Sequence, residues 1–222
     1  MRVLVLLGAP GAGKGTQADI LARNLGLPRI ATGDLFRAQI RAGTPLGLEA
    51  KVFIDKGELV PDAVTVRMLL DRLEAPDASN GAILDGFPRN RAQAEELDAA
   101  LERRGARVEA ALYIEVPESD LLARLSGRWL CSAHGHTYHD HAYPPRSPGI
   151  CDFDGSPLIQ RDDDRREVVE ARLEKQLAPL HDLVDYYRPR GVLRRVDGRR
   201  PIAAVTADLL DHLEPRPYWR RP

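Results

Sequence analysis

Residues 8–16 of the chain read GAPGAGKGT, and they join a short apolar run, Arg2–Leu7, to a segment with helical periodicity, Thr16–Leu25. Glycines allow a backbone to fold closely around a phosphate, so that successive N–H groups point inward, and the N-terminus of the following helix adds partial positive charge. The lysine of the motif, Lys14, is placed to reach the phosphates that are transferred. A tight strand-to-helix turn that binds nothing is the alternative, but a Gly-Lys pair at this place after a strand favours a phosphate-binding loop.

Outward from this loop, short apolar runs alternate with helical patterns along most of the chain. Several runs are apolar without alternation of period two, as expected for strands that are covered on both faces. This alternation predicts a three-layer α/β core around a five-stranded parallel sheet. We expect strands at Arg2–Leu7, Arg29–Ala31, Ala82–Leu84, Ala110–Val116 and Val192–Val196, and helices that include Thr16–Leu25, Arg91–Arg103 and Ser119–Leu125.

Two regions interrupt the alternation and are predicted to be insertions into one core. Residues 32–60 hold only short helical patterns separated by glycines, and residues 127–160 are rich in Gly, Pro, His and Asp. A further helix is expected to open at Asp162–Asp164, since acidic residues suit a helix N-terminus, and Pro179 is expected to break or kink it. We therefore predict a core of residues 1–31, 61–126 and 165–214, insertions at 32–60 and 127–164, and a flexible tail at 215–222.

Composition limits the class of protein. The chain has 222 residues, 32 basic and 33 acidic side chains and a formal net charge of −1, so it lacks the basic excess of a nucleic-acid or membrane-surface binder. The first apolar run, Met1–Leu7, is too short for a signal sequence or a membrane span. Two cysteines are too few for a disulfide-rich secreted scaffold. We expect a cytoplasmic monomer that binds neither nucleic acid nor membrane.

Two further polar motifs follow predicted strands. Residues 32–37 read TGDLFR after the second strand, and residues 84–89 read LDGFPR at the end of the third. In an α/β core both motifs reach the carboxyl edge of the sheet, beside the phosphate loop. Asp85 ends an apolar strand, where a carboxylate can orient a metal ion; a helix cap or turn former is the alternative. Arg37 and Arg89 are placed to bind phosphate, and ordinary solvated arginines are the alternative.

The second insertion carries two pairs of metal-ligand residue types, Cys131-x-x-His134 and Cys151-x-x-Asp154, each followed by a glycine. Four ligands in two such pairs suit tetrahedral Zn²⁺, which accepts thiolate, imidazole and carboxylate. A disulfide between the two cysteines and a metal-free, hydrogen-bonded cluster are the alternatives. Alternative ligands nearby are His136, His139 and His141.

The form GxPGxGKGT resembles the nucleoside monophosphate kinases, and specifically the adenylate kinases. Gly15 stands where other phosphate loops have Ser or Thr, and the hydroxyl comes one residue later, at Thr16. A direct bond from a loop hydroxyl to Mg²⁺ is therefore in doubt. The motifs TGDLFR and LDGFPR, the turn at residues 57–61 and Gln93 resemble the AMP-binding half of that family. Residues 127–164 resemble its long lid, and the resemblance extends from about residue 1 to residue 213.

This resemblance implies a P-loop NTPase core that transfers one phosphoryl group reversibly between Mg²⁺·ATP and AMP. It also implies that residues 32–60 form the AMP-binding insertion, and that structural zinc staples a lid with too little core to fold alone. The implied ATP-binding residues are Gly11, Ala12, Gly13, Lys14, Gly15, Thr16, Arg124, Arg128, Thr137, Tyr138 and Arg200. The implied AMP-binding residues are Thr32, Arg37, Glu58, Leu59, Val60, Gly86, Phe87, Pro88, Arg89, Gln93, Arg161 and Arg172. The implied catalytic residues are Lys14, Asp85, Arg89, Arg128, Arg161 and Arg172, and the implied metal ligands are Cys131, His134, Cys151 and Asp154.

Three other functions remain open on the sequence. A kinase for UMP or CMP is the nearest, although the long lid and Gln93 favour AMP, because a side-chain amide can pair with both a donor and an acceptor of adenine. A zinc-ribbon binding module that uses ATP as a switch would hydrolyse ATP without transferring phosphate. An inactive structural homologue is the third, and it is disfavoured because each expected charged position is filled.

Overall fold

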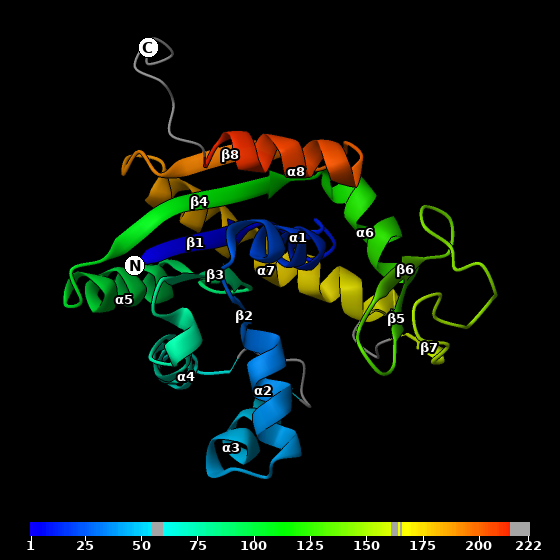
Figure 1. The fold of residues 1–222 in the computed structure, drawn as a ribbon, viewed down its shortest axis with the longest axis horizontal. Coiled ribbons are helices and arrows are strands. Elements are labelled where there is room, and N and C mark those ends of the chain that lie inside the picture. The colour runs from blue at the N-terminus through cyan, green and yellow to red at the C-terminus, as the bar shows by residue number, and fades with distance from the viewer. Residues whose placement is uncertain (55–59, 161–163, 165, 214–222) are drawn as a thin grey trace.

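The computed structural model describes residues 1–54, 60–160, 164 and 166–213, without the side chains of residues 166, 167 and 172, and its centre is a five-stranded sheet (Figure 1). The strands lie in the order β2-β3-β1-β4-β8, and each neighbouring pair is parallel. The predicted α/β fold with a five-stranded parallel sheet is confirmed. The strands are β1 (Arg2–Leu7), β2 (Arg29–Ala31), β3 (Gly81–Asp85), β4 (Arg107–Glu115) and β8 (Leu193–Asp197).

Helices cover both faces of this sheet; Figure 1 shows α1 in front of it and α7 behind it. The helix α1 contacts α8, and α5 contacts both α4 and α7. Because both faces are covered, every residue of β3 is buried, which explains why its sequence does not alternate. The core helices are α1 (Lys14–Leu25), α4 (Asp62–Leu73), α5 (Arg91–Glu102), α6 (Glu118–Ser126), α7 (Arg166–Tyr187) and α8 (Ile202–Asp211), with a 3₁₀ turn at Pro76–Ala78.

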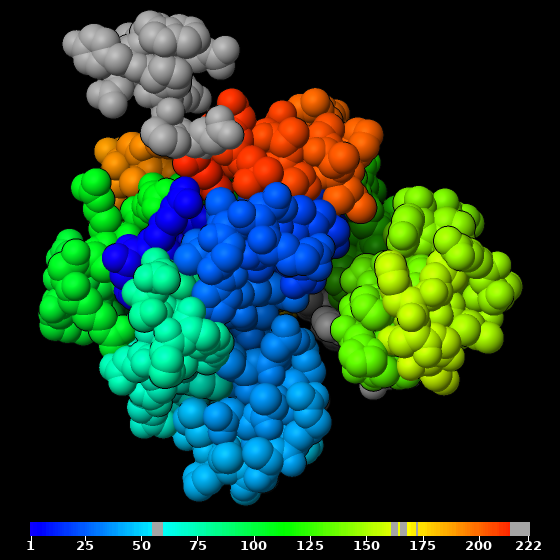
Figure 2. Space-filling model, viewed as in Figure 1, coloured from blue at the N-terminus to red at the C-terminus, as the bar shows by residue number. Residues whose placement is uncertain are grey.

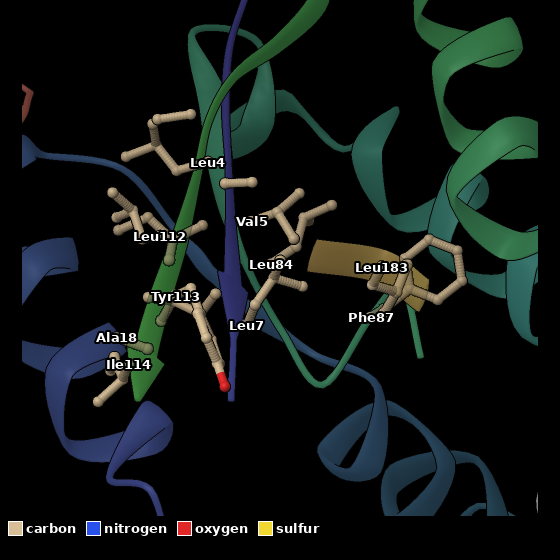
Figure 3. Close-up of a cluster of buried hydrophobic side chains, with 14 of the residues drawn as sticks. Leu4, Val5, Leu7, Ala18, Leu84, Phe87, Leu112, Tyr113, Ile114 and Leu183 are labelled. Carbon is tan, nitrogen blue, oxygen red and sulfur yellow. The ribbon is translucent and has the colours of Figure 1, made fainter. Parts of the chain in front are cut away.

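The main hydrophobic core lies between these layers. Figure 3 shows side chains from the strands, among them Leu4, Leu84 and Leu112, between Ala18 of α1 and Leu183 of α7. All five side chains are buried. Removing such apolar surface from water is the main favourable term in folding, and it holds the carboxyl ends of β1 and β3 in a fixed register at the edge where the polar motifs lie.

The first insertion is a helical pair, α2 (Thr32–Arg41) and α3 (Pro45–Ile54). It has a small core of its own, in which Phe36 and Ala50 meet Val64 and Met68 of α4. The helices approach closely at Gly47, where a Cβ atom would lie 2.2 Å from the carbonyl oxygen of Gln39.

The second insertion is a three-stranded antiparallel sheet in the order β6-β5-β7. Its strands are β5 (Arg128–Cys131), β6 (Thr137–His139) and β7 (Leu158–Ile159). We call residues 127–160 the lid. Figure 2 shows the lid and the α2–α3 pair as separate lobes with a recess between them.

The break expected at Pro179 is wrong, because α7 continues through this residue as one helix, whereas a kink there stays a prediction. A proline inside a helix costs about 3 kcal/mol. Packing outweighs this cost: Leu173 before the proline and Leu180 and Leu183 after it are all buried in the main core. Asp162, Asp163 and the predicted tail at 215–222 lie outside the described residues.

No helix in the part of the chain that the structure describes is both long enough and apolar enough to span a bilayer.

Candidate active site

The phosphate loop joins β1 to α1, as the motif predicts. Its conformation depends on glycine: Gly11 has a φ of +82°, and a Cβ atom there would lie 2.9 Å from Cγ of Leu125. A Cβ atom on Gly8 would lie 2.9 Å from the carbonyl oxygen of Ile114. Lys14 opens α1, and its ammonium donates to the carbonyl oxygens of Gly8 at 2.7 Å and Ala9 at 2.9 Å. The lysine is therefore held over the loop, where phosphates would bind.

Asp85 lies beside this loop at the end of β3, where it is in register with Leu6 of β1 and Ala31 of β2. Its side chain is only 10% exposed. An ideal Cβ atom on Gly15 would be 3.6 Å from Oδ2 of Asp85, which places the carboxylate against the first turn of α1. The predicted neighbourhood of Asp85 and the phosphate loop is thereby confirmed, and its role as a metal-orienting group stays a prediction.

The acceptor motifs meet at the same edge. The hydroxyl of Thr32, at the start of α2, donates to the carbonyl oxygen of Gly86 at 3.0 Å. Nε of Arg89 donates to that same oxygen at 2.9 Å. Phe87 is fully buried, so its side chain is part of the core and only its backbone can face a ligand. Arg37 is exposed and pairs with Asp34 within α2.

Gln93 is held in one orientation by two opposite contacts. Its Oε1 accepts from the backbone N–H of Arg89 at 2.7 Å, and its Nε2 donates to Oδ1 of Asp62 at 2.6 Å. The side chain is buried, so Gln93 is not an ordinary exposed residue of a surface helix. Sequence reasoning missed Asp62 and also Asn90, which caps α5 by accepting from the backbone N–H of Gln93 at 2.9 Å. The Asn-x-x-Gln spacing at the start of a predicted helix was the available signal.

The lid brings cysteine, histidine and aspartate side chains together. Cys131, His136, Cys151 and Asp154 each offer a ligand atom, and these atoms lie within 4.8 Å of one another. Both cysteines are free thiols, so the disulfide alternative is wrong in this structure. Thiolate, imidazole and carboxylate are the donors that tetrahedral Zn²⁺ accepts, and this donor set fits a zinc ion.

The histidine in this group differs from the one that the spacing favoured. Nδ1 of His136 lies 3.2 Å from Sγ of Cys151, whereas Nδ1 of His134 lies 2.7 Å from Asp154 on the exposed side of the cluster. His134 contacts Sγ of Cys131 through its backbone N–H, at 3.4 Å, and its side chain is 67% exposed. A hydrogen bond from the backbone N–H of Ser156, followed by contacts to Cys131 and His134, lowers the pKa of Asp154, which therefore stays anionic.

The arginines predicted to bind nucleotide lie on several elements, and their roles stay predictions. Arg128 opens β5, and its Nε donates to Asp164, whose side chain is fully buried, at 2.9 Å. Arg124 lies in the last turn of α6, and Arg200 pairs with Asp208 of α8. Arg161, like Glu58 and Leu59, lies outside the described residues, as does the side chain of Arg172.

Three further residues that were predicted to bind nucleotide differ in their burial. Thr137 of the lid is exposed, whereas Tyr138 is buried in the lid core, with its hydroxyl accepting from the backbone N–H of Asp152 at 2.7 Å. The Tyr138 side chain is therefore part of the lid's own packing. Val60 is buried against the helical insertion.

A glycine-rich loop between a parallel strand and a helix, with a lysine over it and a carboxylate at the end of the neighbouring strand, defines a nucleotide-binding protein of the P-loop NTPase class. The adenylate kinase family model matches residues 6–192. An adenylate kinase of Bacillus subtilis is 50% identical over 210 residues, which cover 95% of this chain and 97% of the relative. One from Moorella thermoacetica is 52% identical over 205 residues (91% and 93%), and one from Streptomyces avermitilis is 48% identical over 212 residues (95% and 96%). The chain belongs to the adenylate kinase family.

Proposed function

We propose that this chain transfers a phosphoryl group reversibly between ATP and AMP, giving two molecules of ADP, and thereby maintains the balance of adenine nucleotides. The observation that supports the proposal is that the phosphate loop and the two acceptor motifs lie at one edge of the sheet. The phosphate loop follows β1, and the acceptor motifs follow β2 and β3, the next strands in the sheet. Open α/β sheets bind their ligands at this carboxyl edge.

On the donor side, the loop from Gly11 to Thr16 would bind the phosphates of ATP through backbone N–H groups, with Lys14 reaching the transferred group. Arg124, Arg128 and Arg200 would contact the same nucleotide. Magnesium bound with ATP would neutralise part of the phosphate charge. Asp85, which lies against the first turn of α1, would orient that metal ion.

On the acceptor side, Gln93 would recognise adenine. Each half of its amide makes one contact within the protein, and a side-chain amide has two N–H groups and two lone pairs on its oxygen. Counting the contacts of the described residues, one N–H group and one lone pair of the Gln93 amide are therefore left for a base. Arg37 and Arg89 would bind the AMP phosphate, with Thr32 beside them.

The chemistry follows from charge. Phosphoryl transfer requires alignment and electrostatic stabilisation and little covalent work by the protein. Lys14, Arg89 and Arg128, with Arg161 and Arg172, would surround the transferring group. No general base is required, because the phosphate of AMP is already anionic at pH 7.

A coupled assay for ADP formation from ATP and AMP tests the proposal directly. We expect ADP only when both nucleotides and Mg²⁺ are present, and faster initial rates with AMP than with UMP, CMP or GMP. ATP hydrolysis without transfer would instead support the binding-module alternative. Absence of ADP would overturn the proposal.

We also propose a structural zinc ion in the lid, held by Cys131, Cys151 and Asp154 with one histidine. The close approach of the four donors supports it. Two free, buried thiols fit a reducing, cytoplasmic environment. The predicted monomer is tested by light scattering during gel filtration, which should give a mass near 24.6 kDa.

A further inference from the structure

Arg29, which belongs to none of the predicted motifs, connects three carboxylates beside the phosphate loop. Its Nη1 donates to Asp19 of α1 at 3.0 Å. Its Nε and Nη2 both donate to Oδ2 of Asp85, at 3.2 and 2.7 Å. The same Nη2 lies 3.7 Å from Oδ2 of Asp34 in α2. One guanidinium group on β2 therefore joins α1, α2 and β3.

This arginine is a permanent, partly buried charge. Its side chain is 27% exposed. Burial by itself lowers the pKa of Arg29, but attraction to Asp85 and Asp19 outweighs this, and the pKa is raised overall. A planar guanidinium with several donors in fixed directions can hold a carboxylate in one orientation, which a lysine ammonium cannot.

The position of Arg29 relates it to both nucleotide sites. A Cβ atom on Gly15 would lie 3.3 Å from its Nη2, so the guanidinium is in contact range of the first turn after the phosphate loop. On the other side, Asp34 pairs with Arg37, the predicted ligand of the AMP phosphate. Alternating charges therefore run from Asp85 through Arg29 and Asp34 to Arg37.

The two oxygens of Asp85 differ. Oδ2 accepts two hydrogen bonds from Arg29. No group among the residues that the structure describes donates a hydrogen bond to Oδ1. The carboxylate is thus held in place through Oδ2, and Oδ1 is the oxygen that could face a metal ion or its waters.

We propose that Arg29 is a positioning residue for phosphoryl transfer, which fixes Asp85 and neutralises the acidic edge where two anionic nucleotides meet. This inference rests on the proposed function. It has two separable parts. Orientation of Asp85 should affect kcat, whereas the positive charge should affect nucleotide affinity, even without metal, because three carboxylates near the phosphates are repulsive unless a cation offsets them.

Three variants separate these parts. Arg29→Gln removes both the positive charge and the planar set of guanidinium N–H donors. Arg29→Lys keeps the charge but lacks that planar set of donors. Arg72→Gln is the matched control: Arg72 has the same 27% exposure and a two-point contact with Asp77, at 2.8 and 2.6 Å. That pair lies at the end of α4 that leads into the start of β3, at the opposite edge of the sheet from Asp85.

The measurements are ATP affinity by calorimetry in EDTA, kcat and KM with Mg²⁺, and the thermal midpoint. For Arg29→Gln we expect metal-free ATP to bind about three- to tenfold more weakly and kcat to fall about tenfold. The free Mg²⁺ concentration that gives half-maximal rate should fall, because the edge has become more negative. Arg29→Lys should regain ATP affinity to within about twofold while kcat stays low. Arg72→Gln should change none of these.

Several outcomes would overturn the inference. One is wild-type affinity and kcat in Arg29→Gln. Another is an equal loss of all parameters with a fall in thermal midpoint beyond that of Arg72→Gln, which would mean a purely structural role. If Arg29→Gln does not fold, a kcat of Arg29→Lys equal to that of wild type would overturn the inference that Arg29 positions Asp85. A wild-type protein that forms no ADP would instead refute the proposed function, before any variant is compared.

Discussion

Arg89 is the exposed arginine of the acceptor motif, and its Nε is turned back onto the carbonyl oxygen of Gly86. If it stabilises the charge of the transferring group, Arg89→Ala should lower kcat/KM by about 10² to 10⁴. Two residues along the chain, Arg91 is 64% exposed and pairs with Glu95 on the surface of α5. Arg91→Ala should stay within about twofold of wild type. Initial rates with ATP and AMP check both variants, and near-normal turnover of Arg89→Ala would remove Arg89 from the site.

For single residues, the sequence predicts those that belong to a motif and misses those that hold a motif residue in place. Gln93 was identified by resemblance, but its partly buried partner Asp62 lies 31 positions away in sequence and has no local signal. Arg29 was read only as part of a strand, because its three carboxylate partners come from separate elements. Such contacts depend on the register of β2 against β3, which no local pattern specifies.

The lid is the element whose stability should depend on a metal. Its own buried cluster consists of Cys131, Tyr138, Cys151 and Leu158 alone, which is too small a core to fold independently. We expect one zinc ion per chain by elemental analysis. Cys151→Ser should lose the zinc and lower the thermal midpoint, because a ligand that binds only the folded state stabilises it.

His141→Ala is the control for this experiment, because His141 lies in the lid outside the group of four donors; it should keep the zinc. The sequence spacing favours His134 as the fourth ligand, whereas the structure places His136 among the four donors. The zinc content of His134→Ala and His136→Ala decides between them. A purified wild-type protein that is free of zinc yet has the same thermal midpoint with and without added zinc would contradict the prediction.

The contact between α5 and α7 should weaken at alkaline pH. The hydroxyl of Tyr186 on α7 donates to Asp98 of α5 at 2.9 Å. Burial, followed by this hydrogen bond to Asp98, raises the pKa of Tyr186 to about 12. In the unfolded chain a tyrosine ionises near pH 10. The stabilisation is therefore complete below about pH 10 and is lost as pH rises toward 12.

Free energies of unfolding by urea, measured from pH 8 to 12, test this for Tyr186→Phe. The advantage of wild type over the variant should be constant below about pH 10 and shrink above it. Tyr143→Phe is the control, because Tyr143 is 53% exposed. A difference between wild type and Tyr186→Phe that is independent of pH would refute the assignment.

For the whole molecule, the sequence predicts the sheet well because its central strands are uninterrupted apolar runs that glycine-rich or polar turns separate. The runs at β1 and β3 are short and apolar and end at turn residues, which favours buried strands. Parallel strands bring the motifs that follow them to one edge. The predicted break at Pro179 is wrong because a proline only indicates a local free-energy cost to the helix. Whether α7 continues depends also on the packing of its apolar residues against the main core.

The recess between the lid and the α2–α3 pair (Figure 2) leaves room for both lobes to move toward each other. Water is always a competing acceptor for the phosphoryl group, so we predict that both lobes close on the nucleotides and that the predicted arginines then surround the phosphates. We expect ATP hydrolysis without AMP to be at least about 10² times slower than transfer with AMP. Small-angle X-ray scattering should show a smaller radius of gyration with ADP and Mg²⁺ at saturation than with no nucleotide, and AMP alone should give a smaller change. Hydrolysis as fast as transfer, or an unchanged radius at saturation, would mean that the two lobes do not close to exclude water, and the electrostatic account would then lack the dry site on which it depends.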